Sequence, residues 1–394
     1  MKKKMKILID IQCLQSASRS RGIGKYVESF LYELTHRDLL NVTVVTNSSS
    51  ILPIKSYHVD GHVELNTDGY DLRLDDSANF NPWQYASLQY TKFINNSNYD
   101  LYLIPSVFEG YIDTVVYPDF RACNTRIAVI HYDLIPLEIP EKYLVNRNYS
   151  NFYTDRLDSY SAFDLVFCIS HAAQNSLLEY GIKTGEVSYI GSAVPKNIVN
   201  AQCSDVFLHT AEEELLKSKL EGNKFLLSVG VYEYRKNIEY LIECLPYLED
   251  KEIFLVLVCH QSDAANEDIF LNYREILHRV ILVPEISSSM LKWLYGNASL
   301  LLFPSRAEGF GLPLIEAIEE GLLPLASNIA VHREVLEDDT LLFELDDVHV
   351  LANVINKKIS LSHEGDLRRL LKKVQIQYSW HGVVDRFLER LNNV

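Results

Sequence analysis

The stretch EGFGLPLIE, residues 308–316, decides how the second half of this chain folds. Residues 298–303, ASLLLF, precede it as an apolar run with the length of a buried strand. Gly309 and Gly311 allow a tight loop, and Pro313 is favoured in the first turn of a helix. The sequence therefore predicts a strand, a loop and a helix N-terminus, whose exposed N–H groups suit an anion such as a phosphate.

Two carboxylates bracket this loop. Glu308 is expected in the loop beside a bound group. Glu316 is expected on the first helical turn, where a carboxylate can accept two hydrogen bonds from vicinal hydroxyls such as those of a ribose. The helix dipole alone also favours acidic residues there, so either glutamate taken singly fits a solvated surface position. Phosphate, ribose and one further polyol together indicate a nucleotide sugar.

A second stretch, SVGVYEYRKN at residues 228–237, predicts another part of the same site. A strand ends near Gly230, and Arg235 and Lys236 stand just before a helix that begins near Asn237. Adjacent cations in such a loop can reach a diphosphate from two directions, arginine as a planar fork and lysine as a point charge. A solvated charged pair is the alternative, but the glycine at the end of the strand favours phosphate binding.

The composition of the chain narrows the classes of protein to consider. At 394 residues it is too long for most single cores, so two domains are expected. A hydrophobic content of 47% fits a globular protein, and no apolar run approaches the length of a transmembrane helix. The net charge of −16 argues against nucleic acid as a partner. Six cysteines without a CxxC pair or a zinc-like spacing to histidine indicate a reducing, cytoplasmic location.

The first six residues carry four lysines. Such a cluster can attract anionic lipid head groups, which would place the protein peripherally at the inner face of the cell membrane; a solvated chain end is the alternative. The apolar run that follows is short and contains Asp10. We therefore interpret this segment as a basic leader that runs into a first strand, not as a signal peptide.

Strands and helices alternate along both halves of the chain, which predicts parallel sheets covered by helices on both faces. The predicted strands are residues 6–11, 42–46, 101–105, 126–131, 164–170, 224–230, 253–259, 279–283 and 298–303. The predicted helices are residues 23–34, 171–181, 211–220, 238–248 and an amphipathic segment at 374–394. The alternation breaks between residues 195 and 222, so two doubly wound halves joined there are expected.

The first strand-to-helix loop, SRSRGIGKY at residues 18–26, is a third candidate. Gly22 and Gly24 let the backbone approach a ligand closely, and the helix N-terminus that follows adds its dipole. The loop is not the full GxGxxG motif of a dinucleotide site, because Val27 stands at the third glycine. Many loops of this kind need a glycine for their own geometry, which is the alternative.

The stretch IAVIHYDLIPLEIP, residues 127–140, ends a strand at His131 and places Asp133 in the exit loop. Polar groups that converge at the ends of strands are typical of a site, so both residues are candidates for the reaction centre. The alternatives are a structural histidine and an aspartate that caps its own turn. Ser170, which closes the strand at 164–170, is expected to cap the next helix.

These stretches together resemble one family. Residues 308–316 resemble the E-x7-E motif of retaining glycosyltransferases of family 4, which have the two-domain GT-B fold. The sequence R-K-N after a glycine resembles the donor-diphosphate motif of the family, and RGIGKY resembles the SGIGRY loop of its bacterial polysaccharide enzymes, among them O-antigen mannosyltransferases. The resemblance covers nearly the whole chain and is strongest over residues 225–316.

The resemblance implies an α/β fold of two doubly wound Rossmann-like domains that face a central cleft. It implies an acceptor-side domain at residues 1–200, a nucleotide-sugar domain at 201–375 and a C-terminal helix at 376–394 that crosses back to the first domain. It places the ribose on Glu316 and the donor sugar on Glu308. The donor-binding residues are then Gly22, Gly24, Arg235, Lys236, Glu308, Gly309, Phe310, Gly311, Leu312 and Glu316, and the catalytic candidates are His131, Asp133 and Glu308.

The resemblance also implies a reaction: transfer of a hexose from a nucleotide sugar to a glycan hydroxyl, with retention at the anomeric carbon, in bacterial surface polysaccharide synthesis. The LIP loop and RGIGKY favour mannose from GDP-mannose. No metal or other cofactor is expected, because the acidic pairs lack a DxD; Arg235, Lys236 and the helix N-terminus would stabilise the leaving diphosphate.

Several partners and alternatives stay open on the sequence. The expected acceptor is a lipid-linked glycan, and a complex with other glycosyltransferases is compatible with the family. One alternative is a transferase that uses a UDP-sugar and acts on a protein or lipid. The other is an inactive subunit that binds the donor within a transferase complex.

Overall fold

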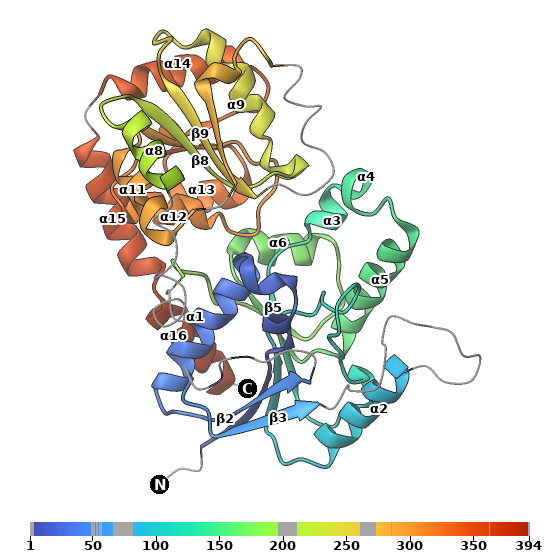
Figure 1. Ribbon diagram of the computed structural model, residues 1–394. Helices are drawn as coiled ribbons and strands as arrows, with labels where there is room; N and C mark the ends of the chain where they lie inside the picture. The colour runs from blue at the N-terminus through green and yellow to red at the C-terminus, as the bar shows by residue number, and fades with distance from the viewer. Residues whose placement is uncertain are drawn as a thin grey trace. The chain divides into compact units, whose positions relative to one another are not determined.

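The computed structural model describes residues 4–48, 52, 54, 57–65, 82–195, 211–260, 273–284, 286–361 and 363–392. The chain divides into two compact units, one formed by Met1–Ala201 with Ser379–Val394 and the other by Gln202–Tyr378 (Figure 1). Residues 1–3 of the lysine-rich start and residues 196–210 of the predicted connection lie outside the described residues. Within the described part of the chain, no helix is long and apolar enough to cross a membrane.

The first unit contains a seven-stranded sheet in which all neighbouring strands are parallel, in the order β3-β2-β1-β4-β5-β6-β7. Its strands are β1 (Lys6–Asp10), β2 (Asn41–Asn47), β3 (Gly61–Leu65), β4 (Leu101–Ile104), β5 (Ile127–His131), β6 (Leu165–Cys168) and β7 (Glu186–Tyr189). The five inner strands are confirmed as predicted. The two edge strands, β3 and β7, were not predicted, because each is only partly buried and lacks a continuous apolar run.

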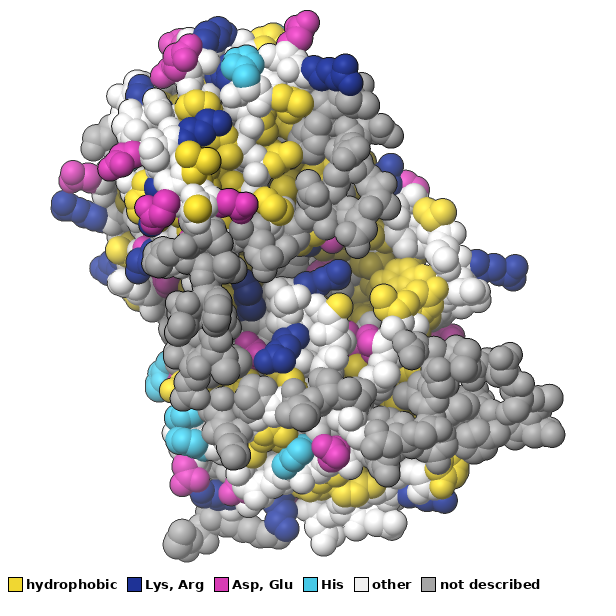
Figure 2. All heavy atoms as spheres, in the orientation of Figure 1, with side chains coloured by type: hydrophobic (Ala, Val, Ile, Leu, Met, Phe, Trp, Pro, Cys, Tyr) yellow, Lys and Arg dark blue, Asp and Glu magenta, His cyan; other side chains and the backbone are white. Residues whose placement is uncertain are grey.

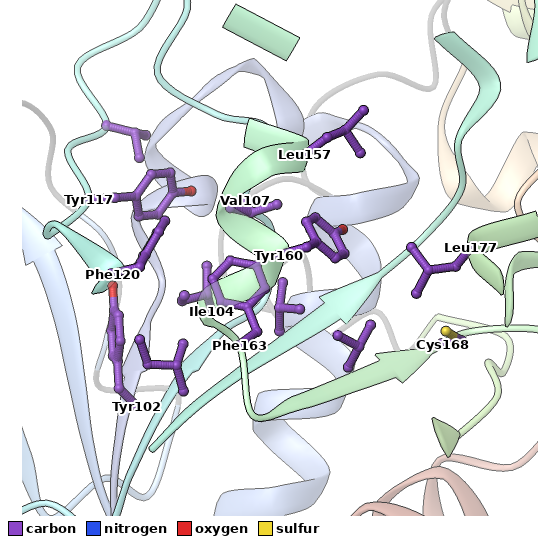
Figure 3. Close-up of a cluster of buried hydrophobic side chains, with 14 of the residues drawn as sticks. Tyr102, Ile104, Val107, Tyr117, Phe120, Leu157, Tyr160, Phe163, Cys168 and Leu177 are labelled. Atoms are coloured by element: carbon purple, nitrogen blue, oxygen red, sulfur yellow. The ribbon is translucent and has the colours of Figure 1, made fainter. Parts of the chain in front are cut away.

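Helices cover both faces of this sheet. They are α1 (Gly22–His36), α2 (Pro82–Asn95), α3 (Ile135–Glu138), α4 (Pro140–Tyr143), α5 (Arg147–Asp158), α6 (His171–Glu179) and α16 (Trp380–Asn392). In Figure 1, α1 and α16 lie together on one face, and α2 and α5 lie on the other. A core of buried side chains lies on the face covered by α2 and α5, and it includes Tyr102 and Ile104 of β4 together with Tyr160 and Phe163 (Figure 3).

The ends of α6 follow local rules. The Oγ of Ser170 accepts a hydrogen bond from the N–H of Ala173 at 2.9 Å, which confirms the predicted N-cap. The helix stops at Glu179, and Gly181 adopts a left-handed conformation with φ of 65°. That conformation favours glycine and explains why the helical pattern ends there.

The C-terminal segment differs from the prediction. The amphipathic spacing at 374–394 predicted one helix, but the helix is interrupted at Tyr378 and Ser379, between α15 (Glu364–Gln377) and α16. The indole N–H of Trp380 donates to the carbonyl of Val194 at 2.7 Å. The final helix is thereby attached to the segment that follows β7, within the first unit.

The second unit contains a six-stranded parallel sheet in the order β10-β9-β8-β11-β12-β13. Its strands are β8 (Phe225–Val231), β9 (Phe254–His260), β10 (Val280–Val283), β11 (Leu300–Phe303), β12 (Pro324–Ser327) and β13 (Leu342–Phe343). Its other helices are α8 (Ala211–Leu220), α9 (Ile238–Cys244), α11 (Ser288–Asn297), α12 (Leu312–Glu319), α13 (Ala330–Leu336) and α14 (Val348–Ile359). Helices α9 and α14 cover one face, and α11, α12, α13 and α15 cover the other (Figure 1).

The strand order fixes where a ligand can bind in this unit. From β8 the chain winds outward through β9 and β10, and it then returns to the other side of β8 with β11. The loops after β8 and β11 therefore leave the sheet side by side in opposite directions, which creates a crevice at the carboxyl edge. All four residues of β11 are buried, as the ASLLLF run predicted. Helix α9 ends at Cys244, earlier than predicted, because Pro246 lacks the N–H that would continue it.

Candidate donor site

Arg235, Lys236 and Glu308 meet at the carboxyl edge of the second sheet, between β8 and β11. The loop after β8 passes through the 3-10 turn Tyr234–Lys236 before α9 begins, and the loop after β11 carries Glu308. The backbone N–H of Arg306 donates to the carbonyl of Arg235 at 2.6 Å, which joins the two loops. The structure thus brings together three residues that the sequence placed in the donor site separately.

Both oxygens of the Glu308 carboxylate accept hydrogen bonds from neighbouring side chains. Its Oε1 accepts from Lys236 Nζ at 2.6 Å and from Ser305 Oγ at 2.7 Å, and its Oε2 accepts from Arg235 Nη1 at 2.8 Å. Only 8% of the side chain is exposed. Burial alone would raise the pKa of Glu308, but the charges of Arg235 and Lys236 outweigh burial and lower that pKa to about 2. The carboxylate is therefore ionised at neutral pH.

The side chain of Lys236 is held by apolar surroundings. Its stem lies over Gly230, where an added Cβ would sit 3.3 Å from Lys236 Cε, and its Nζ lies 4.7 Å from the ring centroid of Phe303. Burial lowers the pKa of Lys236, while the Glu308 carboxylate acts in the opposite direction. Arg235 is held on its other side by Glu233, with Nε and Oε2 2.8 Å apart. Both cations are therefore fixed in place before any ligand arrives.

The loop that follows Glu308 leads into α12. Gly311 has φ of 95°, a left-handed conformation that favours glycine, and it starts the helix at Leu312 without a side-chain cap. The buried Phe310 packs its ring on Tyr378, 5.3 Å away, so this predicted donor-site side chain is part of the core. Gly309 is buried in the same loop. The residues that line the start of α12 thus present backbone groups, which suits a phosphate.

Glu316 lies just beyond the first helical turn in which it was predicted. Because α12 begins at Leu312, Glu316 is its fifth residue and falls in the second turn. Its Oε2 accepts a hydrogen bond from the hydroxyl of Tyr295 on α11 at 2.8 Å. Burial raises the pKa of Tyr295, and the neighbouring Glu316 charge adds to this, so the phenol stays a hydrogen-bond donor.

His332 on α13 was not predicted as a site residue. It is completely buried beside the loop: an added Cβ on Gly311 would lie 3.5 Å from its Cδ2. Its Nδ1 lies 2.8 Å from the carbonyl of Ser327 and so carries the proton, and its buried Nε2 has no hydrogen-bond partner among the described residues. Burial lowers the pKa of His332 to about 4. His332 reaches this loop because β12 pairs beside β11 and α13 follows it. No spacing in the sequence indicates this position.

His131 and Asp133 lie at the carboxyl end of β5 in the first unit. The Nδ1 of the buried His131 is 2.9 Å from the hydroxyl of Tyr160, and its Nε2 is buried without a partner in the described structure. Burial lowers the pKa of His131 to about 3, so its imidazole is neutral at pH 7. Asp133 accepts from the N–H of Ile135 at 3.1 Å, which is the turn-capping role that the sequence left open.

The switch point of the first sheet holds a carboxylate that sequence reasoning missed. The loops after β1 and β4 meet there, and buried Glu109 accepts hydrogen bonds from the hydroxyls of Ser16, Ser18 and Ser106 at 2.8, 2.8 and 3.0 Å. Burial raises the pKa of Glu109, and the three hydroxyls act against this. A single strand-end glutamate carries no distinctive spacing, so only the sheet order reveals this cluster.

Gly22 and Gly24 occupy the start of α1. Gly22 is exposed as the first helical residue. Gly24 is buried, and an added Cβ would lie 2.4 Å from both the Cα and the carbonyl oxygen of Arg19. The room that Gly24 leaves is therefore filled by the chain's own backbone, which is the alternative that the sequence had left open for this glycine.

Replacing Gly24 by alanine should therefore destabilise the protein. The backbone of Arg19 cannot rotate away as a flexible side chain can, so we expect a cost of about 1–3 kcal/mol, against the roughly 1 kcal/mol that alanine gains over glycine in a helix. Urea unfolding measures the change. Gly365→Ala is the control, because nothing lies within 4 Å of a Cβ there. Equal stability of the two variants would contradict the packing role.

On the face drawn in Figure 2, the described lysine and arginine side chains are dispersed among acidic, hydrophobic and uncharged ones. The protein carries 53 acidic and 37 basic side chains, which gives the net charge of −16. The paired cations of the candidate site are thus set in a protein whose charge otherwise repels anions. Their attraction for a phosphate group has to come from contacts at short range.

The chain is similar to known glycosyltransferases. Residues 211–374 match the family model described as glycosyl transferases group 1. The serotype-specific mannosyltransferase WbdA of Escherichia coli is 29% identical over 95% of this chain and 46% of that protein. The O-antigen chain mannosyltransferase RfbU of Salmonella typhimurium is 30% identical over 46% of this chain and 47% of its own length. The chain thus spans less than half the length of these curated relatives.

The solved structures show the fold. Sucrose-phosphate synthase from Thermosynechococcus elongatus superposes with a TM-score of 0.69 at 17% identity, and the match covers 99% of each chain. At this identity the likeness shows the fold alone. Together with the two parallel sheets, it confirms the predicted GT-B class of two Rossmann-like domains.

Proposed function

Residues 211–374 form a domain of the glycosyl transferases group 1 family, and from this we propose that the protein transfers a hexose from a nucleotide-sugar donor to a glycan hydroxyl. The observation that carries the proposal is the buried cluster of Arg235, Lys236 and Glu308 at the switch point of this domain. We further propose mannose from GDP-mannose as the donor and a bacterial surface polysaccharide as the product, on the strength of relatives named as mannosyltransferases.

In this proposal the second unit provides the charge that the reaction needs. As the bond from the anomeric carbon to the diphosphate breaks, negative charge develops on the leaving oxygens. Arg235 and Lys236, together with the uncapped start of α12, would stabilise that charge without a metal ion. Preorganised cations of this kind act without reorganisation during the reaction, because buried contacts already hold them. Glu316 would bind the ribose hydroxyls.

The first unit would bind the acceptor. His131, Asp133 and Glu109 all follow strands at the carboxyl edge of the first sheet, where polar groups can bind sugar hydroxyls. We propose a front-face route with retention, in which a leaving phosphate oxygen takes the proton of the acceptor hydroxyl as the new glycosidic bond forms. A cytoplasmic site of action and a lipid-linked glycan as acceptor belong to the same proposal.

A ligand screen tests the donor. Thermal unfolding is measured with GDP, UDP, ADP and CDP, each with magnesium and with EDTA. A nucleotide at a hundred times its dissociation constant should add about 2.7 kcal/mol of stability. The protein is then incubated with GDP-mannose and mannose oligosaccharides, and NMR reads the anomeric configuration of the product. Stabilisation by GDP in EDTA and a retained product are expected; an inverted product, or no response to any nucleotide, contradicts the proposal.

Glu316→Gln tests the proposed ribose contact. The variant keeps the shape of the side chain but weakens it as an acceptor, so we expect GDP to bind about tenfold more weakly, while inorganic pyrophosphate binds as before. Isothermal titration of both ligands measures this difference. Tyr295→Phe removes only the hydroxyl that donates a hydrogen bond to Glu316. This variant therefore shows how much of the loss comes from a misoriented Glu316 side chain and how much from a lost contact between Glu316 and the ribose. If pyrophosphate weakens as much as GDP, Glu316 does not act on the ribose.

A further inference from the structure

The two cations of the candidate donor site already hold an anion that belongs to the chain. Arg235 Nη1 and Lys236 Nζ bind opposite oxygens of the Glu308 carboxylate at 2.8 and 2.6 Å. These are the same cations that the proposed function assigns to the diphosphate. An incoming diphosphate therefore meets a carboxylate with the same sign of charge, buried in the place where its own oxygens would bind.

We infer that Glu308 is an exchangeable counterion: a diphosphate displaces its carboxylate from Arg235 and Lys236, and hydroxyls of the intact donor's sugar then bind the displaced carboxylate. The inference rests on the proposed function. It adds that Glu308 sets the difference in affinity between the donor and the nucleoside diphosphate that is released. The protein thereby binds the nucleotide sugar while it disfavours its own product.

The hydrogen bonds of Glu308 give the reason. A carboxylate that is 92% buried needs donors on both oxygens, and three side chains supply them here. After displacement, Ser305 is the only one of these three that does not also serve the diphosphate. With an intact donor, sugar hydroxyls can replace the lost partners. With a nucleoside diphosphate alone they cannot, so a buried negative charge is left under-satisfied beside a second anion.

Neighbouring residues favour exchange over simple addition of the diphosphate. The Phe303 ring and Gly230 hold the stem and ammonium of Lys236, and Glu233 holds Arg235 through its Nε. Glu308, in contrast, sits in the loop between β11 and α12, three residues before a glycine with positive φ. The cations are thus fixed by residues of the two strands and of the loop after β8, whereas Glu308 is carried by a loop that contains two glycines, Gly309 and Gly311.

The test measures the affinity of GDP and of GDP-mannose for the unchanged protein and for Glu308→Gln by isothermal titration. Removal of the charge should tighten GDP binding by about tenfold or more, since the competing anion is gone. The affinity for GDP-mannose should change far less, because this ligand loses the contact between its sugar and the Glu308 carboxylate while it gains access to the cations. The ratio of the two dissociation constants should therefore fall at least about tenfold. Unchanged or weaker GDP binding overturns the exchange.

Two further variants keep the test informative. Glu320→Gln removes an equal charge from the same unit, where Glu320 pairs with Lys292 at 3.3 Å and its side chain is 31% exposed; GDP affinity should change by less than about threefold. Glu308→Asp keeps the charge on a shorter side chain, so its GDP affinity should stay near that of the unchanged protein. If it tightens GDP as much as Glu308→Gln does, the charge is not the cause and the inference is wrong.

The experiment also separates two kinds of failure. If GDP, UDP, ADP, CDP and their sugars all fail to bind both proteins, the donor site itself is refuted, and the exchange with it. If a nucleotide binds both proteins with equal affinity, the donor site stands and only the exchange falls. Should Glu308→Gln fold poorly because two cations lose their partner, thermal unfolding with inorganic pyrophosphate provides the readout: pyrophosphate should stabilise this variant more than it stabilises the unchanged protein.

Discussion

Replacing Lys236 by alanine is expected to lower kcat for sugar transfer by roughly a hundredfold to a thousandfold. The ammonium of Lys236 is held at 2.6 Å from Glu308 by a buried stem, so its charge is in place before the diphosphate begins to leave. A cation fixed in a buried site stabilises developing charge more than a solvated one, because water screens it less. Release of GDP from GDP-mannose in the presence of the acceptor measures the effect.

The control for this prediction comes from the far end of the same strand. Lys224 precedes β8, its side chain is 61% exposed, and its Nζ lies 3.6 Å from Asp250. Lys224→Ala therefore removes an equal charge from the same unit at the opposite edge of the sheet, and it should keep transfer within about threefold of the unchanged protein. If Lys236→Ala also stays within that range, Lys236 does not stabilise the leaving group.

Acid is expected to destabilise both units through two buried histidines. His131 and His332 are fully buried, and burial lowers their pKa values to about 3 and about 4 from an unfolded value of 6.5. Between pH 6.5 and these values the unfolded chain binds protons that the folded protein does not, so stability falls as the pH falls. From pH 7.5 to pH 5 each histidine should cost about 2 kcal/mol, or about 4 kcal/mol together.

Urea unfolding at pH 7.5 and pH 5 measures this loss, and single variants assign it. His332→Gln should remove about 2 kcal/mol of the pH dependence. The variants are needed because burial raises the pKa values of Asp10 and Glu109, which act in the opposite direction. Glu308 does not affect this comparison, since the stability that its lowered pKa contributes is lost only below pH 4.5. A pH dependence that His332→Gln leaves unchanged would contradict this account.

The sequence predicts the strand, loop and helix around the candidate donor site well, but it does not predict the contacts between the two loops. The run ASLLLF identifies β11 because a parallel inner strand is buried on both faces, and Gly311 and Pro313 mark the loop and helix that follow. The pairing of Lys236 with Glu308 spans 72 residues and depends on β8 and β11 being neighbours. That neighbourhood is a property of strand order, which hydrophobic periodicity does not encode.

The errors have equally local causes. Glu316 falls in the second turn because α12 begins at Leu312, directly after the left-handed Gly311 and one residue before Pro313, and no composition rule fixes that start to within one residue. The predicted helix at 374–394 is two helices, because apolar spacing can continue across a break of two residues. His332 was missed because its burial depends on α13 packing back on the loop, which no motif indicates.

The place of α16 in the fold has a consequence for synthesis on the ribosome. Val383, Val384 and Phe387 of this last helix are completely buried in the first unit, where Phe387 contacts the rings of Phe30 and Phe167. Residues 202–378, which form the second unit, all leave the ribosome before this helix does. The first unit therefore completes its core only after the second unit has been synthesised, and until then the apolar side of α1 lacks its contacts with α16.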